Sequence, residues 1–377
     1  MIKGFDSPIY ITSPLLPSLD EVQVSLEKIW QSKWLTNHGV FHNEFEERTS
    51  KVLNVKNVSI FNNGTIALLV AIRALNIREG EVITTPFTFA ATPHCISWNG
   101  LQPVFCDVEE DTMTIDSSKI ENHITDKTRA ILGVHVYGFP CDVEKIQKIA
   151  NKHNLKVIYD AAHAFSAKIN GVPIGRFGDI SMFSFHATKL FNSVEGGCLT
   201  YNDDKLKEKI YLLRNFGIMN EEFVCDIGMN GKMSEIHAAI GLLNYDKFEG
   251  EKEKRKQIYN TYVDRLSKIS GIKIPFPGVN LENSYQYFVI RVLEEEFGEN
   301  RNFLYDELKK YNVFSRKYFY PLCSDYAPYE KLASSSSDNL AVANVLKEEV
   351  LCLPFYGDLS IHDVQKICDI IAEIKGS

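Results

Sequence analysis

Three short polar stretches of this sequence carry side chains that could act together in catalysis. The turn NNGT (Asn62–Thr65) follows the apolar run VSIF, Asp160 follows KVIY, and Lys189 comes shortly after ISMFSF. A glycine turn that opens a helix offers unpaired N–H groups to a phosphate. A carboxylate at the end of a buried strand needs a cationic partner, and a desolvated lysine amine can form an imine with an aldehyde. Taken singly, each stretch is also explained without chemistry, as a turn with a helix cap, a capping carboxylate and a surface lysine.

The three stretches together match the needs of pyridoxal phosphate. That cofactor requires a lysine for its aldehyde, a carboxylate that keeps its ring nitrogen protonated, and a cradle for its phosphate. In open α/β sheets ligands collect at the carboxyl ends of the strands, so such groups can meet at one edge. The stretch TPFTFAAT adds Phe87 and Phe89 as candidates to cover the ring, although aromatic residues at such positions commonly belong to the core.

The elements that must position these residues form an α/β pattern. Short apolar runs that do not alternate with polar residues are typical of strands covered by helices on both faces. Seven such runs occur, at 58–61, 82–85, 103–106, 130–136, 156–159, 180–185 and 197–201. Between them, 65–75 and 143–153 carry apolar residues at helical spacing. The pattern predicts a seven-stranded, mostly parallel sheet with helices on both faces.

A second, smaller unit is expected at the C-terminal end. A long helical pattern over 235–268 passes from apolar to highly charged and leads into it. The unit contains a strand-like YQYFVIRVL (285–293) and helical patterns at 300–311 and 360–375. We expect a large α/β domain over residues 1–250, with the N-terminal segment, and a small α+β domain over residues 251–377.

The composition excludes several function classes. Apolar residues make up 45% of the 377 residues and the formal net charge is −8, so a large core can form and a basic nucleic-acid footprint is not expected. The sequence holds no apolar run long enough to cross a membrane and no signal-peptide pattern, which predicts a cytoplasmic protein. The eight cysteines lack the spacing of a zinc site, and we expect reduced thiols and no metal.

Several spaced motifs resemble those of the DegT/StrS-type nucleotide-sugar aminotransferases, which are pyridoxal-phosphate enzymes of the aspartate-aminotransferase fold (fold type I). In chain order the motifs are SKWLTNHG, NNGTIAL, PFTFAAT, DAAHA, SFHATK followed by EGG, and NGKMSEIHAAIGL. The resemblance extends from about residue 12 to residue 374. It implies that fold, that cofactor, transamination of a nucleotide-linked ketosugar, and a homodimer with shared active sites.

The resemblance also implies roles for particular residues. Lys189 would bind the cofactor's aldehyde and, once released, would carry the proton between the amino donor and the cofactor, while Asp160 would pair with the ring nitrogen. The other implied cofactor contacts are His163 beside the ring, Gly64, Thr65 and Ser184 at the phosphate, Phe89 as the stacking aromatic residue, and Asn230 at the phosphate of the neighbouring subunit.

The resemblance points to one sugar in particular. The loop SFHATKLFNSVEGG and the stretch RKYFYPL (316–322) are similar to those of members that aminate C4 of dTDP-4-keto-6-deoxy-D-glucose. The product would be dTDP-4-amino-4,6-dideoxy-D-glucose, with L-glutamate as the donor, whereas members that act on C3 have a loop rich in Gly and Asp after the lysine. Weaker candidates for contacts to the sugar or its diphosphate, each equally explained by a surface or packing role, are His186, Lys33, Trp34, Arg214, Lys317 and Tyr318.

Other functions stay open at this point. The chain could aminate another ketosugar, such as a C3 ketone or a GDP- or UDP-linked 4-ketosugar, or act on a small phosphorylated ketone. It could also be a regulatory protein that keeps the fold without turnover. Family members that act as 3-dehydratases have histidine in place of the lysine, and a pure binder has no need of an imine-forming amine, so Lys189 favours transamination. Aminated deoxysugars usually enter surface polysaccharides or glycosylated small molecules.

Overall fold

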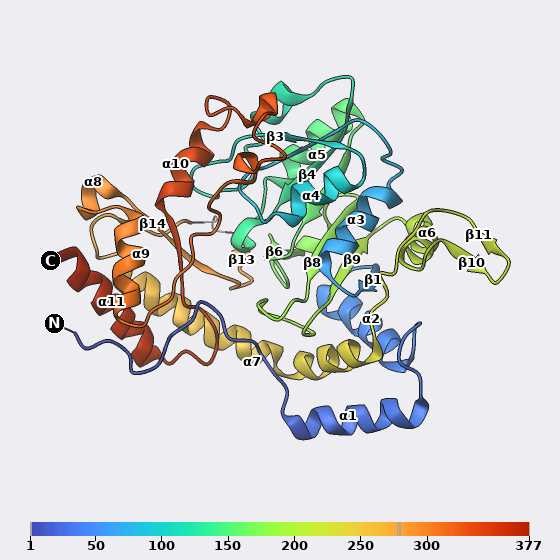
Figure 1. The fold of residues 1–377 in the computed structure, drawn as a ribbon, viewed down its shortest axis with the longest axis horizontal. Coiled ribbons are helices and arrows are strands. Elements are labelled where there is room, and N and C mark those ends of the chain that lie inside the picture. The colour runs from blue at the N-terminus through green and yellow to red at the C-terminus, as the bar shows by residue number, and fades with distance from the viewer. Residues whose placement is uncertain (1, 277, 279, 377) are drawn as a thin grey trace.

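The computed structural model describes residues 2–276, 278 and 280–376 (Figure 1). Its central sheet has seven strands in the order β1-β9-β8-β5-β4-β2-β3. In chain order they are β1 (Asn57–Phe61), β2 (Glu81–Thr84), β3 (Gln102–Phe105), β4 (Thr128–Val134), β5 (Lys156–Asp160), β8 (Ile180–Ser184) and β9 (Gly197–Tyr201). The pairs from β8 to β3 are parallel, whereas β9 runs antiparallel to both β8 and β1. The predicted seven-stranded, mostly parallel sheet is confirmed.

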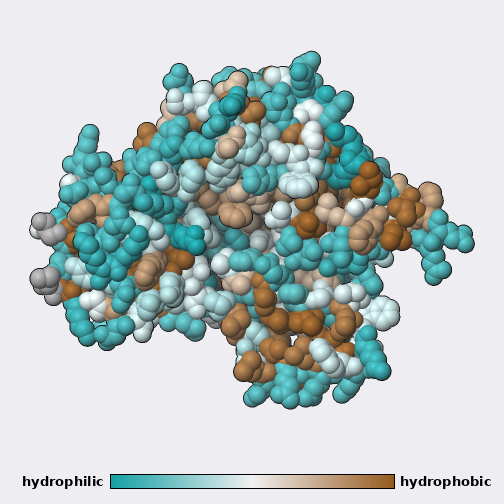
Figure 2. All heavy atoms as spheres, viewed as in Figure 1, coloured by the Kyte–Doolittle hydropathy of each residue, from teal (hydrophilic) through white to brown (hydrophobic). Residues whose placement is uncertain are grey.

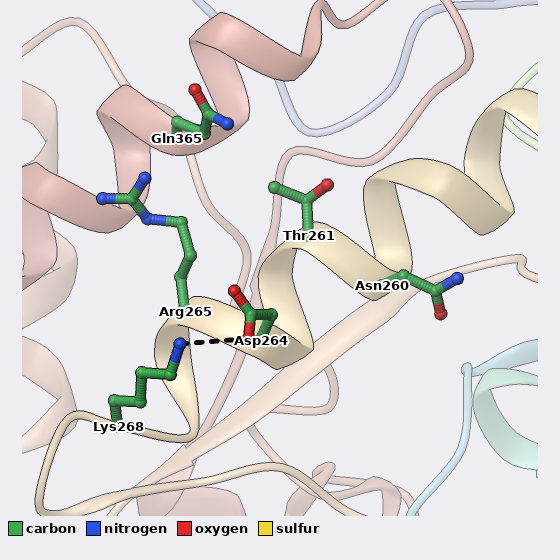
Figure 3. A pocket seen from close by; sticks show the side chains of 6 residues that line it. All are labelled: Asn260, Thr261, Asp264, Arg265, Lys268 and Gln365. Carbon is green, nitrogen blue, oxygen red and sulfur yellow. Dashed lines mark hydrogen bonds and ion pairs between the residues drawn. The ribbon is translucent and has the colours of Figure 1, made fainter.

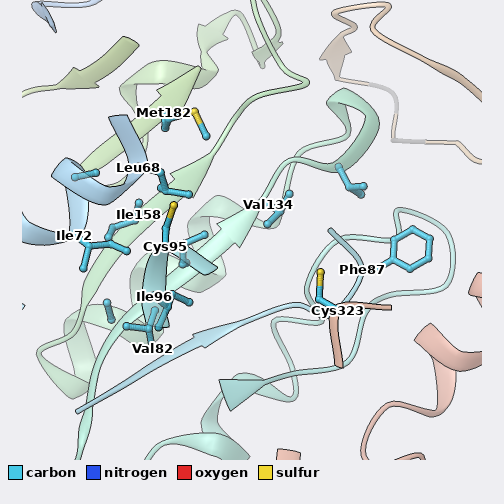
Figure 4. Close-up of a cluster of buried hydrophobic side chains, with 14 of the residues drawn as sticks. Leu68, Ile72, Val82, Phe87, Cys95, Ile96, Val134, Ile158, Met182 and Cys323 are labelled. Carbon is cyan, nitrogen blue, oxygen red and sulfur yellow. The ribbon is translucent and has the colours of Figure 1, made fainter. Parts of the chain in front are cut away.

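Helices cover both faces of this sheet. They are α2 (Val40–Leu53), α3 (Gly64–Ala74), α4 (Ala91–Trp98), α5 (Val143–His153) and α6 (Lys205–Arg214), while α1 (Leu19–Ser32) packs against α7. On β5, Ile158 lies in the same buried cluster as Leu68 of α3 and Ile96 of α4 (Figure 4). Its neighbours Val157 and Tyr159 point the other way, into the cluster formed with α5. The strand sequences therefore do not alternate between apolar and polar residues because both faces of the sheet are buried, as predicted.

Polar side chains fix where the helices begin. A side-chain oxygen at the N-cap accepts a backbone N–H and satisfies one of the donors that the first turn leaves free. Residues that cap in this way are Ser18 of α1, Asn63 of α3, Asp142 of α5, Ser234 of α7 (Glu235–Leu266) and Asn300 of α9 (Arg301–Lys310). Asn63 matters most for the site, because it starts α3 directly at the end of β1.

The small domain forms around a second sheet. Its strands are β12 (Ile272–Lys273), β14 (Phe288–Val292) and β15 (Val350–Leu353), which pair antiparallel in the order β12-β14-β15. Its helices are α8 (Glu294–Phe297), α9, α10 (Ala341–Glu349) and α11 (Ile361–Gly376). The expected boundary at 250/251 lies inside α7, which runs from beneath the large sheet to this unit (Figure 1). Residues 2–9, grouped with the large domain in the prediction, pack instead along the small one, where Ile9 forms a bridge with Val313.

Two short accessory sheets complete the fold. The strands β6 (Lys168–Ile169), β7 (Val172–Pro173) and β13 (Leu281–Glu282) form one of them. The hairpin of β10 (Ile218–Asn220) and β11 (Phe223–Val224) projects beyond α6 (Figure 1). Exposed apolar side chains gather on two parts of the surface in Figure 2, over α1 with its following loop and on the hairpin. They include Trp30, Trp34, Leu35 and Val40 on the first and Met219, Phe223, Val224 and Ile227 on the second.

No described helix has the length and apolar character that a membrane span requires.

Candidate active site

Lys189 lies in the loop that follows β8. Its side chain is partly buried, and its N–H donates to the carbonyl of His186 at 2.8 Å. Desolvation lowers the pKa of the Lys189 amine from its ordinary 10.5 to about 8, although the nearby Asp160 carboxylate opposes that shift. A substantial fraction of the amine is therefore neutral just above neutral pH, as a nucleophilic lysine requires.

Asp160 is the last residue of β5, the strand next to β8. Its Oδ2 accepts a hydrogen bond of 2.8 Å from the Thr92 hydroxyl, and its Oδ1 accepts one of 3.1 Å from the N–H of Ala162. Burial raises the pKa of this carboxyl above its ordinary value. Within the part of the chain that the structure describes, no cation forms an ion pair with Asp160, so the charged carboxylate lacks the partner that a protonated ring nitrogen would supply.

His163 is buried three residues beyond Asp160 and stays neutral. Its Nδ1 accepts the backbone N–H of Tyr137 at 3.1 Å, which places the ring proton on Nε2. Burial first, and Lys189 second, lower the pKa of His163 well below 6.5. The Tyr287 ring packs edge-on against the imidazole, with the two ring centres 5.0 Å apart. The position thus holds a neutral imidazole in a fixed orientation close to Lys189 and Asp160.

The predicted phosphate cradle lies at the start of α3. A Cβ placed on Gly64 would come within 3.1 Å of the Met182 sulfur and 3.2 Å of the Ser184 Cβ, so Gly64 lies against the end of β8. Gly64 is buried, Ser184 is half-buried and Thr65 is exposed. The first turn of α3 therefore presents free N–H groups, a hydroxyl from Thr65 and the nearby Ser184 at one strand edge, which suits a phosphate.

Gly197 allows this cradle to form, and its replacement by alanine should damage it. A Cβ at Gly197 would lie 2.7 Å from both the Cα and the N of Gly64, where only backbone could yield. Overpacking of this kind costs about 1–3 kcal/mol of the free energy of unfolding. We expect Gly197→Ala to lower stability in urea unfolding and to weaken cofactor affinity. Gly250→Ala, at an open position inside α7, is the control: it should leave cofactor affinity unchanged and should not lower stability, because alanine favours a helix more than glycine does. Wild-type stability and cofactor affinity in Gly197→Ala would contradict the close approach.

Phe89 and Asn230 are the two remaining residues for which the resemblance implies a cofactor contact. Phe89, in the turn before α4, is 61% exposed, whereas Phe87 is core and packs edge-on against Tyr137. Asn230 is exposed, and its carbonyl accepts from the Asn62 side chain at 3.2 Å, so it lies beside the NNGT turn of its own chain. The stacking role of Phe89 and the intersubunit role of Asn230 stay predictions.

Of the weaker sugar-binding candidates, His186 and Tyr318 lie close to groups of the site. His186 is exposed, with its Nδ1 2.9 Å from the Thr188 hydroxyl and its Nε2 3.6 Å from a Glu195 oxygen. Tyr318 packs against Tyr287, whose ring also contacts His163. Lys317, next in the chain to Tyr318, directs its amine over the Tyr305 ring of α9 at 4.3 Å.

Lys33, Trp34 and Arg214 lie elsewhere. Lys33 ends α1 and Trp34 is exposed beside it. Arg214 is buried, and its guanidinium donates to Glu46 at 3.0 Å and to the carbonyl of Ile60. These contacts join α6 to α2 and β1, so the structure supports a packing role for Arg214 and lends no support to a sugar contact.

One cluster has the composition of a metal site. The potential ligand atoms of His38, His42 and Glu46 lie within 4.8 Å of one another. The guanidinium of Arg214, however, is 3.2 Å from His38 Nε2 and is paired with Glu46. A second cation beside it would be repelled. Burial lowers the pKa of both histidines to about 4, which keeps them neutral next to Arg214.

A surface hollow between α7 and α11 contains none of the groups discussed above (Figure 3). Its charges pair locally, with Lys268 3.0 Å from Asp264 and Arg265 bonded to Asp369. It therefore presents no uncompensated charge to a ligand.

Sequence reasoning missed residues that make structural contacts over long distances in the chain, at the site and elsewhere in the large unit. Glu235 is buried and accepts the N–H groups of Phe41 at 2.8 Å and His42 at 2.9 Å, which caps α2 in place of a side chain at Gly39. Thr92 lies in the stretch TPFTFAAT, in which the sequence pattern predicts a role only for Phe87 and Phe89. Neither contact has a local signal in the sequence, because the partners lie 68 residues apart for Thr92 and Asp160 and 194 for Glu235 and Phe41.

The chain is similar to known proteins over nearly its whole length. A model of the DegT/DnrJ/EryC1/StrS aminotransferase family matches residues 19–372. A dTDP-4-amino-4,6-dideoxy-D-glucose transaminase of Escherichia coli is 49% identical over 368 residues, which cover 97% of this chain and 98% of the relative. An enzyme of the same name from Shigella dysenteriae is 44% identical over 370 residues, covering 98% and 100%. The solved structure of DesI in the presence of its TDP-sugar product superposes with a TM-score of 0.94 at 32% identity, covering 99% of this chain and 94% of that one.

Proposed function

Because the chain belongs to the DegT/DnrJ/EryC1/StrS aminotransferase family, we propose that it converts dTDP-4-keto-6-deoxy-D-glucose to dTDP-4-amino-4,6-dideoxy-D-glucose. The cofactor is pyridoxal 5′-phosphate. One observation carries the reaction type: a lysine amine with a pKa lowered to about 8 lies close to a buried carboxylate that has no cationic partner among the described residues. The choice of sugar rests on the 49% identity over nearly the whole of both chains.

Each residue of the site would have a separate role in such a reaction. When bound, pyridoxal phosphate supplies an electron sink for the carbon that loses or gains a proton. Lys189 would hold its aldehyde and, when free, would take up that proton and return it. Asp160 would keep the ring nitrogen protonated, and the first turn of α3 with Thr65 and Ser184 would bind the phosphate. His163, neutral and fixed by Tyr137, would lie beside the ring.

The amino donor, the cellular location and the oligomeric state are also proposals. L-Glutamate is the proposed amino donor, and the cytoplasm is the proposed location. We propose a homodimer in which the apolar surfaces over α1 and on the β10–β11 hairpin are covered by the second copy. Their exposed aromatic and aliphatic side chains support this, because contiguous apolar patches of that kind commonly mark protein interfaces.

The proposed substrate can be tested in half-reactions. Excess L-glutamate should bleach the visible absorbance of the purified enzyme by converting the cofactor to its amine form. After removal of the keto acid, dTDP-4-keto-6-deoxy-D-glucose should restore the absorbance with one equivalent. NMR of the product then identifies the aminated carbon.

The controls separate the parts of this proposal. A GDP-linked 4-ketosugar should restore little or none of the absorbance. Bleaching without recovery would leave the lysine chemistry and the donor in place and would reject the sugar. No bleaching would reject L-glutamate as the donor.

A further inference from the structure

The side-chain amide of Gln286 binds the backbone on both sides of Lys189. Its Oε1 accepts the N–H of Leu190 at 2.7 Å, and its Nε2 donates to the carbonyl of Thr188 at 3.1 Å. The side chain is 2% exposed, so both hydrogen bonds are shielded from water. One amide thus satisfies the peptide groups immediately before and after the lysine.

Gln286 comes from a segment of the small domain that also contacts His163. It precedes β14, whereas Lys189 follows β8 of the large sheet. In the same segment, the Ser284 hydroxyl donates to the backbone carbonyl of His163 at 2.8 Å, and the Tyr287 ring packs edge-on against its imidazole. The segment 284–287 therefore holds two neighbouring parts of the site.

Lys189 needs such support because its loop is not part of a helix or strand. The N–H of Lys189 donates to His186, and Ser193 and Phe185 close the loop through a backbone bond of 2.9 Å. A lysine side chain has four rotatable bonds, so the direction of its amine depends on a fixed backbone. Buried hydrogen bonds to both flanking peptides fix the two peptide planes and thus the Cα–Cβ direction.

We propose that Gln286 is a positioning residue for Lys189: it holds the lysine backbone so that the amine reaches both the cofactor aldehyde and the substrate proton. The inference rests on the role proposed above for Lys189. Gln286 acts on Lys189 through the backbone, since its amide oxygen binds the N–H of Leu190 and its amide nitrogen binds the carbonyl of Thr188.

Gln286→Leu tests this inference, because leucine has a similar size and makes neither bond. We expect kcat to fall about 10- to 100-fold, as a misplacement of roughly 1 Å can cost 10²-fold, while KM for the sugar nucleotide changes less than threefold. Hydrogen–deuterium exchange of the full chain should show faster exchange of the Leu190 amide. Asn339→Leu is the matched control, since that amide also binds two backbone carbonyls, those of Phe105 and Ser334, beside the far edge strand β3. It should leave kcat and the Leu190 exchange unchanged.

Gln286→Glu gives a second, independent readout. A protonated carboxyl has one O–H donor and one acceptor and can make both hydrogen bonds, whereas the ionised form repels the Thr188 carbonyl. The ratio of the variant's kcat to that of the wild type should therefore rise as the pH is lowered. If Gln286→Leu does not fold, this pH profile decides the question.

The possible results separate the two proposals. Wild-type kcat and Leu190 exchange in Gln286→Leu, or a flat kcat ratio in Gln286→Glu, would overturn the positioning role. Borohydride reduction of the wild-type holoenzyme, followed by peptide mass analysis, should fix the cofactor on Lys189. Attachment elsewhere would reject the proposed function itself, whatever the Gln286 variants do.

Discussion

Lys189→Ala should abolish transamination and leave the protein folded. The variant loses the amine that attaches the cofactor and also the group that moves the proton. Proton transfer by a positioned side chain contributes about 10²- to 10⁴-fold to a rate, and the loss of attachment adds to this, so we expect kcat to fall by more than about 10⁴-fold. The fold should persist because desolvation of this amine, seen in its lowered pKa, opposes stability.

Visible absorbance, kcat and urea unfolding check this result together. The variant should lack the wild-type visible absorbance even when it retains added cofactor, and its unfolding midpoint should match or exceed that of the wild type. Lys252→Ala is a matched control, because Lys252 is also a partly buried lysine with a lowered pKa, bonded to Ser166 away from the site. Unchanged absorbance and activity in Lys189→Ala would reject both the attachment of the cofactor to Lys189 and its role in proton transfer.

Asp160→Asn should cause the second-largest loss. A neutral amide cannot keep a ring nitrogen protonated, and the electron sink weakens as that proton is lost. Removal of one preorganised electrostatic partner costs about 10²- to 10³-fold, which is the fall in kcat that we expect. The amide oxygen can replace Oδ1 and accept the N–H of Ala162, while the amide NH2 can donate to the Thr92 hydroxyl, so the site should keep its shape.

The same variant makes a prediction about stability and pH in the cofactor-free chain. Burial raises the folded-state pKa of Asp160 above its unfolded value, so the carboxyl contributes stability at low pH and loses that contribution as the pH rises through the raised pKa. Above that pH, Asp160→Asn should be at least as stable as the wild type in urea unfolding. Asp107→Asn is the control: Asp107 is buried but paired with Lys119 at 2.9 Å, so its loss should lower stability and leave kcat unchanged. Wild-type kcat in Asp160→Asn would reject the pairing with the ring nitrogen.

The sequence predicts the sheet well because each strand is buried on both faces. Apolar runs such as KVIY need no partner in the chain to be recognised, and the strand ends that follow them carry Asp160 and Lys189. The strand bounds differ by up to two residues: the run 130–136 corresponds to β4 at Thr128–Val134, since His135 and Val136 lie outside the strand. Local pattern therefore identifies the residues that bear the chemistry and the elements from which they project.

The residues that hold those groups in place could not be predicted in the same way. Gln286 and Glu235 make their contacts across about a hundred or two hundred residues of chain, and neither position has a local signature. Gln286 even lies inside a stretch, YQYFVIRVL, whose apolar character indicates only a strand. For Arg214 the sequence predicted a contact to the sugar or its diphosphate that the structure does not support. Its burial and its ion pair with Glu46 depend on tertiary packing, which the local sequence does not show.

The continuous helix α7 has a mechanical consequence. Its 32 residues extend about 48 Å as one rod, and the expected domain boundary falls within it, so no linker is present there to act as a hinge. The buried cluster around Ile158 also includes Val289 and Cys352 of the second sheet, which ties the two units together a second time. The substrate pocket is therefore expected to be preformed, and discrimination between sugar nucleotides should depend on fixed complementarity more than on closure of one unit over the other.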